Sequence, residues 1–362
     1  MGQECGPLES MVLNNFWANK KVLITGHTGF KGSWLALWLH RLGAEVVGFA
    51  LKSNTTPSLF DQLQLSSNIN SHIGNITDAG AVSRLISEHK PEFVFHLAAQ
   101  SLVLRSYDQT FDTWNTNVMG TANLLEALRQ AGARCTFVGV TTDKVYHNLE
   151  TRHAYVETDR LGGIDPYSAS KSGMELVIDS YRSICGQEGL PISIASARAG
   201  NVIGGGDWCE NRLLPDIARA LSQGQSVETR NPNAVRPWQH VLEPLFGYML
   251  LAERLSGDVK FAQAFNFGPN PQDNRTVEDV MQIALKTWPG AYHTQSSDTA
   301  PHEAGLLMLS IDKAKDVLGW EPRWAFETAV ENTVSWYKAV EEGRDPLSLS
   351  VAQIEAYSNH EI

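Results

Sequence analysis

The segment Tyr167-Ser-Ala-Ser-Lys171 holds the two side chains with the clearest chemical use in the chain. Residues four apart on a helix share a face, so a phenol and an ammonium would be neighbours here. A nearby cation favours the phenolate, which lets a tyrosine that ionises near about pH 10 in water act as a base closer to neutrality. The same spacing also arises by chance, as a core tyrosine beside a solvated lysine. A catalytic interpretation therefore needs a second motif.

A glycine-rich segment near the N-terminus supplies that motif. The apolar run 21–25 is followed by Gly26-His-Thr-Gly29-Phe-Lys-Gly32 and then by a helical stretch, residues 33–42. Strand, glycine loop and helix in this order can bind a dinucleotide, because glycines let the backbone approach a pyrophosphate that faces the helix N-terminus. The next strand-like run, 45–51, completes the context that the motif requires, and makes an ordinary glycine turn the weaker interpretation.

The end of that second strand leaves NAD and NADP as alternatives. It reads Ala50-Leu51-Lys52-Ser53, without an acidic residue. Such an acid would bind a ribose hydroxyl of NAD, whereas a cation at Lys52 could accommodate the 2′-phosphate of NADP. A solvated lysine at a strand end explains Lys52 equally well.

The bulk composition indicates a globular protein. Its 362 residues are 43% hydrophobic and 19% charged, enough for a large core and two lobes. The formal net charge of −11 repels nucleic acid and anionic membranes, so an anionic substrate would need local arginines. No apolar run approaches the roughly 18 residues of a membrane span, and no signal peptide is recognisable, so we expect a cytoplasmic protein. The cysteines, Cys5, Cys135, Cys185 and Cys209, lack CxxC spacing and suit reduced thiols.

Alternating strand-like and helical stretches predict an α/β fold. The expected strands are 21–25, 45–51, 93–97, 136–140 and 191–197, and the main expected helices are 79–89, 113–131 and 166–185. Repeated βα units imply a Rossmann-type, doubly wound parallel sheet with helices on both faces. We expect this domain to span 15–200 and a smaller, mostly C-terminal substrate-binding lobe to span 201–340, with segments such as 261–267 returning to the sheet. Residues 1–14 and 345–362 are expected to be flexible ends.

Several longer sequence motifs carry a family resemblance. They are Gly26-HTGFKGSW-Leu35, Phe95-HLAAQ, Asn117-VMGT, Asp143-Lys144, Asp165-PYSASK, Arg198-AGNVIGGGDW and Arg236-PWQHVLEPL. With them the chain resembles the extended short-chain dehydrogenase/reductase superfamily and, in its NAD-dependent epimerase/dehydratase family, the sugar-nucleotide 4,6-dehydratases. The wording is most similar to the branch that acts on CDP-glucose.

The resemblance implies a role for each matching residue. The expected cofactor-binding residues are Gly26, Thr28, Gly29, Phe30, Lys31, Gly32, Asn75, Ala98, Gln100, Asn117, Tyr167 and Lys171. The expected catalytic residues are Thr142, Asp143, Lys144, Tyr167 and Lys171, and the expected substrate-binding residues are Asn201, Arg212, Arg236, His240 and Glu303. A core position for His240 has equal weight. No HExxH or comparable cluster indicates a metal.

The implied reaction converts CDP-glucose to CDP-4-keto-6-deoxyglucose with loss of water, as a hydro-lyase in deoxysugar and O-antigen biosynthesis. Tyr167 would accept the C4 hydroxyl proton during oxidation at C4, and Asp143 would protonate the departing C6 hydroxyl. Relatives that act on thymidine diphosphate sugars carry Asp-Glu where this chain has Asp143-Lys144. The base that removes the C5 proton is therefore left open.

Other activities stay possible on the sequence alone. A nucleotide-sugar 4-epimerase shares the oxidation at C4, another nucleoside diphosphate hexose could be the substrate, and a non-catalytic dinucleotide sensor could keep the fold. Relatives of this kind usually form homodimers by pairing two long helices, here 113–131 and 166–185, into a four-helix bundle.

Overall fold

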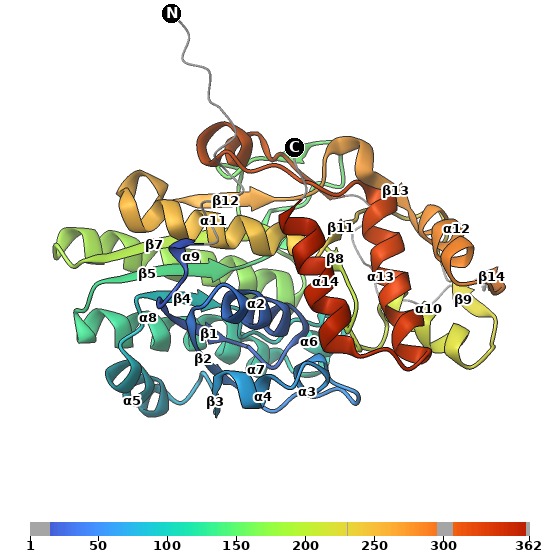
Figure 1. Cartoon of the computed structure of the whole chain (residues 1–362). Helices are drawn as coiled ribbons and strands as arrows, with labels where there is room; N and C mark the ends of the chain where they lie inside the picture. The colour runs from blue at the N-terminus through green and yellow to red at the C-terminus, as the bar shows by residue number, and fades with distance from the viewer. Residues whose placement is uncertain (1–14, 230, 295–306, 360–362) are drawn as a thin grey trace, which may run out of the picture.

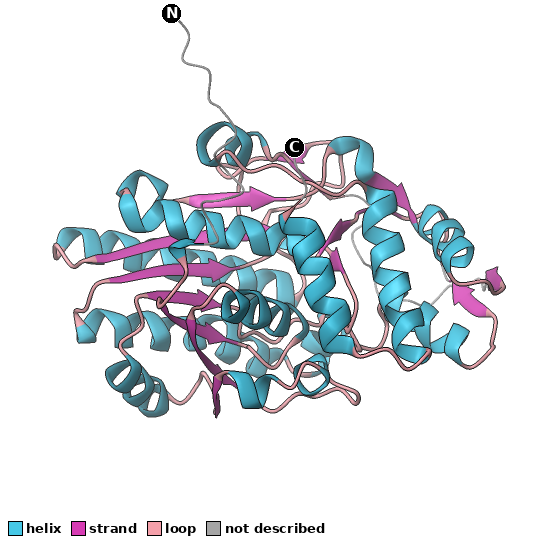
Figure 2. Ribbon diagram, in the orientation of Figure 1, coloured by secondary structure: helices cyan, strands magenta, loops and turns pink. Residues whose placement is uncertain are grey.

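The computed structural model describes residues 15–229, 231–294 and 307–359. Its centre is a seven-stranded sheet in the order β12-β7-β5-β4-β1-β2-β3, in which every neighbouring pair is parallel. The strands are β1 (Lys21–Thr25), β2 (Glu45–Ala50), β3 (Asn70–Ile73), β4 (Phe93–His96), β5 (Cys135–Val140), β7 (Ile192–Ala199) and β12 (Ala264–Phe267). The predicted Rossmann-type fold is confirmed, and β12 lies at one edge of the sheet. Figure 2 shows these strands as a twisted row of arrows between helices.

Alternation along the strands gives the sheet two buried faces. In β1, Val22 and Ile24 join one apolar cluster, whereas Leu23 joins the other. In β4, Phe93 and Phe95 likewise join the first cluster, and Val94 joins the second. Successive side chains of a strand point to opposite faces, so near-continuous apolar runs are what a parallel sheet covered on both sides requires.

Helices cover both faces (Figure 1). One face is covered by α5 (Ala79–His89), α8 (Gly120–Ala131) and α9 (Pro166–Gln187), and the other by α2 (Phe30–Arg41) and α11 (Leu242–Gly257). Shorter helices are α3 (Leu59–Gln62), α4 (Leu65–Asn68), α6 (Val103–Asp108) and α7 (Thr110–Trp114). The expected helix 113–131 is broken: α7 passes into a π-helical turn, η1 (Asn115–Met119), before α8. A π turn inside a helical run often marks a functional position.

A third apolar cluster lies beyond the carboxyl edge of the sheet and joins α10 (Leu213–Ser222), α12 (Val277–Thr287) and α13 (Phe326–Glu341). Short strands complete this lobe, namely β8 (Val202–Ile203), β9 (Val227–Thr229), β10 (Val235–Pro237), β11 (Gln239–His240), β13 (Asn274–Thr276) and β14 (Tyr292–Thr294). No helix among the described residues combines the length and apolar character needed to cross a membrane.

The expectation of a flexible C-terminal end from residue 345 is wrong for the described residues. Residues Pro346–Ser358 form helix α14, which starts with an Asp345 N-cap and a proline in its first turn. Tyr357 is fully buried, packs edge-on against Trp38 of α2, and donates a hydrogen bond to Glu243 at 2.6 Å. The helix buries Ser350, Ile354 and Tyr357, and residues 360–362 lie outside the described part.

The Tyr357 hydroxyl should therefore contribute measurably to stability. We expect Tyr357→Phe to lower the free energy of unfolding by about 1.5–3 kcal/mol, because the buried Glu243 carboxyl loses a donor. Chemical denaturation would measure the loss. Tyr107→Phe is the control, since Tyr107 is 50% exposed and should change stability by no more than about 0.5 kcal/mol. Equal effects of the two variants would contradict the proposed anchoring.

Candidate active site

Three expected catalytic residues follow β5 at the carboxyl edge of the sheet. Thr142 caps the short 3₁₀ turn η2 (Asp143–Val145), and its hydroxyl donates to Asp143 Oδ1 at 2.9 Å. Lys144 Nζ donates to the same oxygen at 3.2 Å and to Asn201 Oδ1 at 3.4 Å. Asp143 is buried, whereas the Lys144 side chain is 27% exposed. A buried carboxylate thus faces a partly solvated cation where open α/β sheets bind ligands.

Tyr167 faces this turn from the start of α9. Burial raises the pKa of its phenol above the ordinary value, and the charge of Lys144 and a hydrogen bond with Thr142 oppose that rise. The tyrosine in the protein without ligands is therefore not a ready base, which corrects the expectation from the Tyr-Lys spacing. Desolvation disfavours the phenolate more strongly than the surrounding cations favour it.

Lys171 lies one turn further along α9, on the same helix as Tyr167. Its Nζ donates to the Val140 carbonyl at 3.1 Å and contacts Met174 Sδ at 3.5 Å. Burial and the charge of Lys31 lower the pKa of Lys171 to about 7, against the opposing charge of Glu175. Among the groups that lower the pKa of Tyr167, the charge of Lys144 has the largest effect.

Further cations surround the same space. Lys31, in the first turn of α2, has its pKa lowered to about 8 by burial and by the charge of Arg212, with Asp143 opposing. Arg212 binds Asp207 at 2.6 Å, and its charge also acts on Tyr167. Lys31 after the glycine loop, Lys144 in the turn after β5 and Arg212 of the second lobe thus repel one another here. Such an arrangement is suited to an anionic ligand.

The glycine loop is tight in the way that a dinucleotide requires. Gly26 has a φ of +80°, and a Cβ at Gly32 would lie 2.1 Å from the Gly26 carbonyl oxygen. The following helix α2 has no side-chain cap and no acidic residue in its first turn. Its N–H groups and positive dipole end are therefore available to a phosphate.

The other first-lobe candidates mostly shape this loop region. Thr28 is buried and donates to the Leu51 carbonyl, and Ala98 N donates to Thr25 Oγ1 beside Gly26. Asn117, within the π turn, is hydrogen-bonded to both backbone groups of Gln100 and donates to Ser170 Oγ on α9. These bonds tie the loop after β4 to the helix that carries Tyr167.

Three candidates of the first lobe remain, at the start of α2 and in the segments after β3 and β4. Phe30 begins α2 and approaches Gly204 of the second lobe, where an added Cβ would lie 3.1 Å from its ring. Gln100 donates its side-chain amide to Thr113 at 3.0 Å. Asn75 follows β3, is exposed, and accepts a hydrogen bond from Thr77 N.

The second-lobe candidates divide into two groups. Asn201 contacts Lys144, and Arg236 lies in β10 with Nη1 donating to the Val235 carbonyl. His240 is instead fully buried between the rings of Trp34 and Trp324, and burial lowers its pKa to about 3. A substrate contact for His240 is therefore not supported, because its ring belongs to the core. Glu303 lies outside the described residues.

Sequence reasoning did not find Asp207, Glu175 and Arg198. Asp207 orients Arg212, and Glu175 and Arg198 form an ion pair at 2.8 Å beneath the β5 turn. Asp207 and Arg198 fall within the recognised word 198–208, so that word was the available signal. Glu175 follows Lys171 by four residues, a helical spacing that we did not use.

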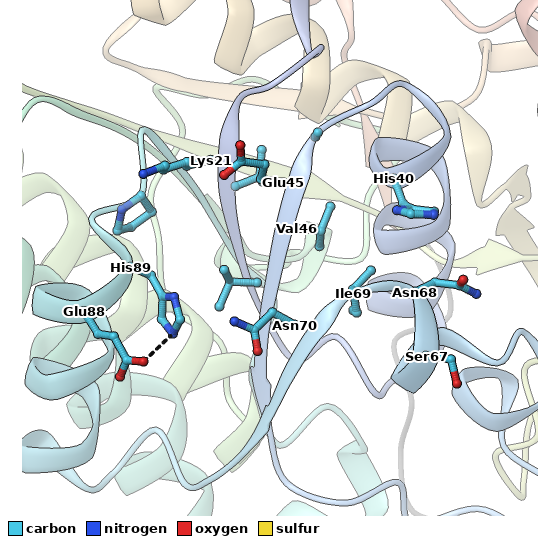
Figure 3. Close-up of a pocket in the computed structure, with 14 residues that line it drawn as sticks. Lys21, His40, Glu45, Val46, Ser67, Asn68, Ile69, Asn70, Glu88 and His89 are labelled. Carbon is cyan, nitrogen blue, oxygen red and sulfur yellow. Dashed lines mark ion pairs between the residues drawn. The ribbon is translucent and has the colours of Figure 1, made fainter.

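A surface hollow lies at the opposite edge of the sheet (Figure 3). Lys21, Glu45 and Asn70 line it at the starts of β1, β2 and β3, beside His89. Ligands of open α/β sheets bind at the carboxyl edge, where Tyr167 and Lys144 lie. This hollow is therefore not the candidate active site.

Comparison with known proteins gives the family. A model of the family described as GDP-mannose 4,6 dehydratase matches residues 23–333. The chain belongs to this dehydratase family. A CDP-glucose 4,6-dehydratase of Salmonella typhimurium is 46% identical over 96% of this chain and 98% of its own. A dTDP-glucose 4,6-dehydratase of Xanthomonas campestris pv. campestris is 29% identical over 87% of this chain and 92% of its own.

Solved structures agree with the fold of this 4,6-dehydratase family. The dTDP-glucose 4,6-dehydratase of Bacillus anthracis, in complex with NAD, has a TM-score of 0.75 at 22% identity and covers 91% of this chain and 99% of its own. The UDP-glucose 4-epimerase of Thermus thermophilus, also with NAD, has a TM-score of 0.75 at 25% identity, over 88% and 98%. Dehydratases and epimerases thus share this architecture, and fold alone does not separate them.

The glycine loop offers a direct test of its tight geometry. We expect Gly32→Ala to lower the free energy of unfolding by about 1–3 kcal/mol, since the new Cβ meets a backbone oxygen that has little room to move. Gly186→Ala in α9 is the matched control, because a methyl group added there would meet no neighbouring atom within 4 Å and alanine favours a helix. Thermal or chemical unfolding measures both. An unaffected Gly32→Ala variant would mean that the loop is looser than described.

Proposed function

We propose that the protein is an NAD-dependent CDP-glucose 4,6-dehydratase, a hydro-lyase of deoxysugar biosynthesis. The observation that carries this proposal is the 46% identity, over nearly the whole of both chains, to a CDP-glucose 4,6-dehydratase. The convergence of Thr142, Asp143, Lys144 and Tyr167 at the carboxyl edge of the sheet supports it. An O-antigen pathway and a cytoplasmic location are proposed with it.

The glycine loop and its neighbours fit a dinucleotide cofactor. Gly26, Gly29 and Gly32 would let the pyrophosphate approach α2, and Lys31 would add a positive charge there. Thr28, Phe30, Ala98, Gln100 and Asn117 would shape the rest of the site, with Asn75 near the adenine end. NAD, when bound, supplies reversible oxidation of the sugar at C4.

Tyr167 and Thr142 would handle the proton at C4 of the sugar. Thr142 lies within hydrogen-bonding reach of Tyr167, so both oxygens can meet one substrate hydroxyl. Lys171 would bind the nicotinamide ribose and add positive charge near the phenol. The raised pKa of Tyr167 means that deprotonation depends on the additional positive charge of the assembled complex.

Asp143 and Lys144 would act as one unit at C5 and C6. The Lys144 ammonium donates to Asp143, so the pair already shares a hydrogen-bonded proton. A 4-ketone acidifies the C5 hydrogen, and the pair would take that proton and deliver one to the departing C6 hydroxyl.

Arginines of the second lobe would hold the substrate diphosphate. Arg212 and Arg236 are the candidates, because a guanidinium binds phosphate oxygens through two parallel hydrogen bonds. Asp207 fixes the Arg212 side chain at 2.6 Å, and Asn201 would contact the sugar from beside Lys144.

A substrate panel tests the proposed function. We expect CDP-glucose, among CDP-, dTDP-, GDP- and UDP-glucose, to give the highest kcat/KM and a product lighter by one water, with NAD as the effective nicotinamide. Mass spectrometry and proton NMR of the product measure this. An unchanged mass with inverted C4 would identify a 4-epimerase instead, and preference for another nucleotide would move the chain to a different 4,6-dehydratase.

Tyr167→Phe removes only the hydroxyl that would accept the C4 proton. We expect turnover to fall by about 10²–10⁴-fold, the usual contribution of a positioned acid-base group. Tyr107→Phe, at an exposed tyrosine, should keep full turnover. Undiminished turnover of Tyr167→Phe would remove this tyrosine from the mechanism.

We further propose that the protein is a homodimer. Phe111, Trp114, Met119 and Leu176 are 39–79% exposed and come from α7, η1 and α9, which pack together. The Trp114 ring lies against Gly173, one turn before Leu176. An exposed apolar patch across two helices is suited to a second copy, because a twofold axis would bury it against itself.

Leu176→Asp should break this proposed dimer, since burying an unpaired carboxylate in an apolar interface is unfavourable. Light scattering after size exclusion should then report a single chain of 39.9 kDa rather than twice that mass. Val259→Asp is the control, because Val259 is 73% exposed in the distant turn η3 (Val259–Phe261). An unchanged mass for Leu176→Asp would place the interface elsewhere.

A further inference from the structure

Glu175 is a fully buried carboxylate beneath the candidate active site. It lies on α9, four residues after Lys171, and is 0% exposed. Its Oε1 accepts a hydrogen bond from Thr141 Oγ1 at 2.5 Å, and its Oε2 accepts from Ser196 Oγ and Arg198 Nη2, each at 2.8 Å. A buried charge with this many donors is held in one position.

These bonds clamp the end of β5. Thr141 stands directly before Thr142, and its own N–H donates to the Ala197 carbonyl on β7. The residue on the other side, Val140, accepts from Lys171 Nζ at 3.1 Å. Helix α9 therefore holds Val140, the last residue of β5, through Lys171, and the next residue, Thr141, through Glu175. The Thr142–Lys144 turn starts from this fixed point.

Arg198 keeps Glu175 charged. Burial alone would raise the pKa of Glu175, but Arg198 and the hydroxyl donors hold it below the ordinary value. Arg198 Nη1 also donates to the Tyr146 hydroxyl at 2.9 Å, which donates to Asn266 Oδ1 on β12 at 2.7 Å. The carboxylate thus belongs to a network that reaches across the carboxyl ends of β5, β7 and β12.

The groups around Lys171 make the negative charge of Glu175 important. Lys31 faces Lys171 from α2, and both the charge of Lys31 and burial disfavour the protonated form of Lys171. His96 faces it from β4, and burial together with Lys171 lowers the pKa of His96 to about 3, so that this ring is neutral. Among the described groups that act on Lys171, Glu175 is the one that favours the cation.

We propose that Glu175 is a positioning residue that keeps Lys171 protonated and holds Thr141, and through it Thr142, in place for the reaction. The inference rests on the proposed function, because it assigns Lys171 a role as a cation beside the sugar and the cofactor. Glu175 touches neither of them and acts through Lys171 and the β5 turn.

Loss of the Glu175 charge should move the titration of Lys171 to lower pH. Lys171 is a cation below its pKa of about 7 and neutral above it. Without the nearby carboxylate the pKa falls further, by roughly one unit or more, so the cation is lost at neutral pH. Activity that needs the cation should then decline at a lower pH than in the wild type and recover on acidification.

The experiment compares Glu175→Gln with the wild type in two measurements. The first is the pH profile of kcat/KM for CDP-glucose, in which the alkaline limb should shift down by about one unit or more. The second is an NMR titration of ¹³Cε-labelled lysine in the protein without substrate, with the Lys171 signal assigned by Lys171→Met. Its midpoint should shift in the same direction.

Two variants serve as controls. Ser196→Ala removes one hydrogen bond to Glu175 but no charge, and should leave the Lys171 midpoint unchanged. Glu175→Asp keeps the charge and should restore the wild-type pH profile, even with a lower kcat. If Glu175→Gln does not fold because Arg198 is left unpaired, the double variant Glu175→Gln with Arg198→Met is titrated against Arg198→Met alone, so that the difference between them is the Glu175 charge.

An unshifted Lys171 midpoint in a folded Glu175→Gln variant, or in the double variant relative to Arg198→Met, would overturn the inference. A shift of equal size in Ser196→Ala would also overturn it, since the effect would then be structural. Wild-type protein that does not turn over CDP-glucose would instead count against the proposed function, and the NMR titration would still decide the inference about Glu175.

Discussion

Burial of opposite charges at the carboxyl edge of one parallel sheet is the constraint on which this site depends. Lys31, Lys144, Lys171 and Arg212 gather around Tyr167, and the buried carboxylates Asp143, Asp207 and Glu175 hold or face three of them. Ionised groups are strongly disfavoured in a low-dielectric interior unless they are paired. Two of these cations are therefore placed by nearby carboxylates, Lys144 by Asp143 and Arg212 by Asp207. The carboxylates determine where the remaining positive charge is available to a ligand.

Much of the fold could be predicted from the sequence because its signals are local. The strands 21–25 and 45–51 are apolar runs, and the helix 79–89 has the predicted bounds of α5. The edge strand β3, Asn70–Ile73, was not predicted, because it is short, polar and partly exposed. Helix α14 was missed although Asp345 and Pro346 are typical helix-start residues. The packing of Tyr357 on Trp38 of α2 and Phe246 of α11, which helps to hold it, is a tertiary contact that the sequence does not show.

The candidate site likewise contains features that the sequence predicts and features that it does not. The glycine loop and the Tyr167–Lys171 pair have fixed spacings, so the sequence predicts where they lie. It does not predict the rotamer of a lysine, and Lys171 turns to the Val140 carbonyl while Lys144 acts on the phenol. His240 shows that a residue within a family-like motif can belong to the core, since its ring packs between two tryptophans. Burial decides both cases, and burial is a property of the assembled tertiary structure.

The same reasoning connects the C-terminal helix to the glycine loop. Glu243 of α11 accepts hydrogen bonds from the Tyr357 hydroxyl and from the Arg323 and Trp324 N–H groups, and burial raises its pKa to about 7. Tyr357 in turn packs on Trp38 of α2, the helix whose first turn faces the expected pyrophosphate. The folded state holds a proton on this carboxyl that the unfolded chain has lost, so stability falls as pH rises from about 4.5 to about 7. Support for α2 is thus strongest below neutrality, through residues that lie more than two hundred positions after the glycine loop in the sequence.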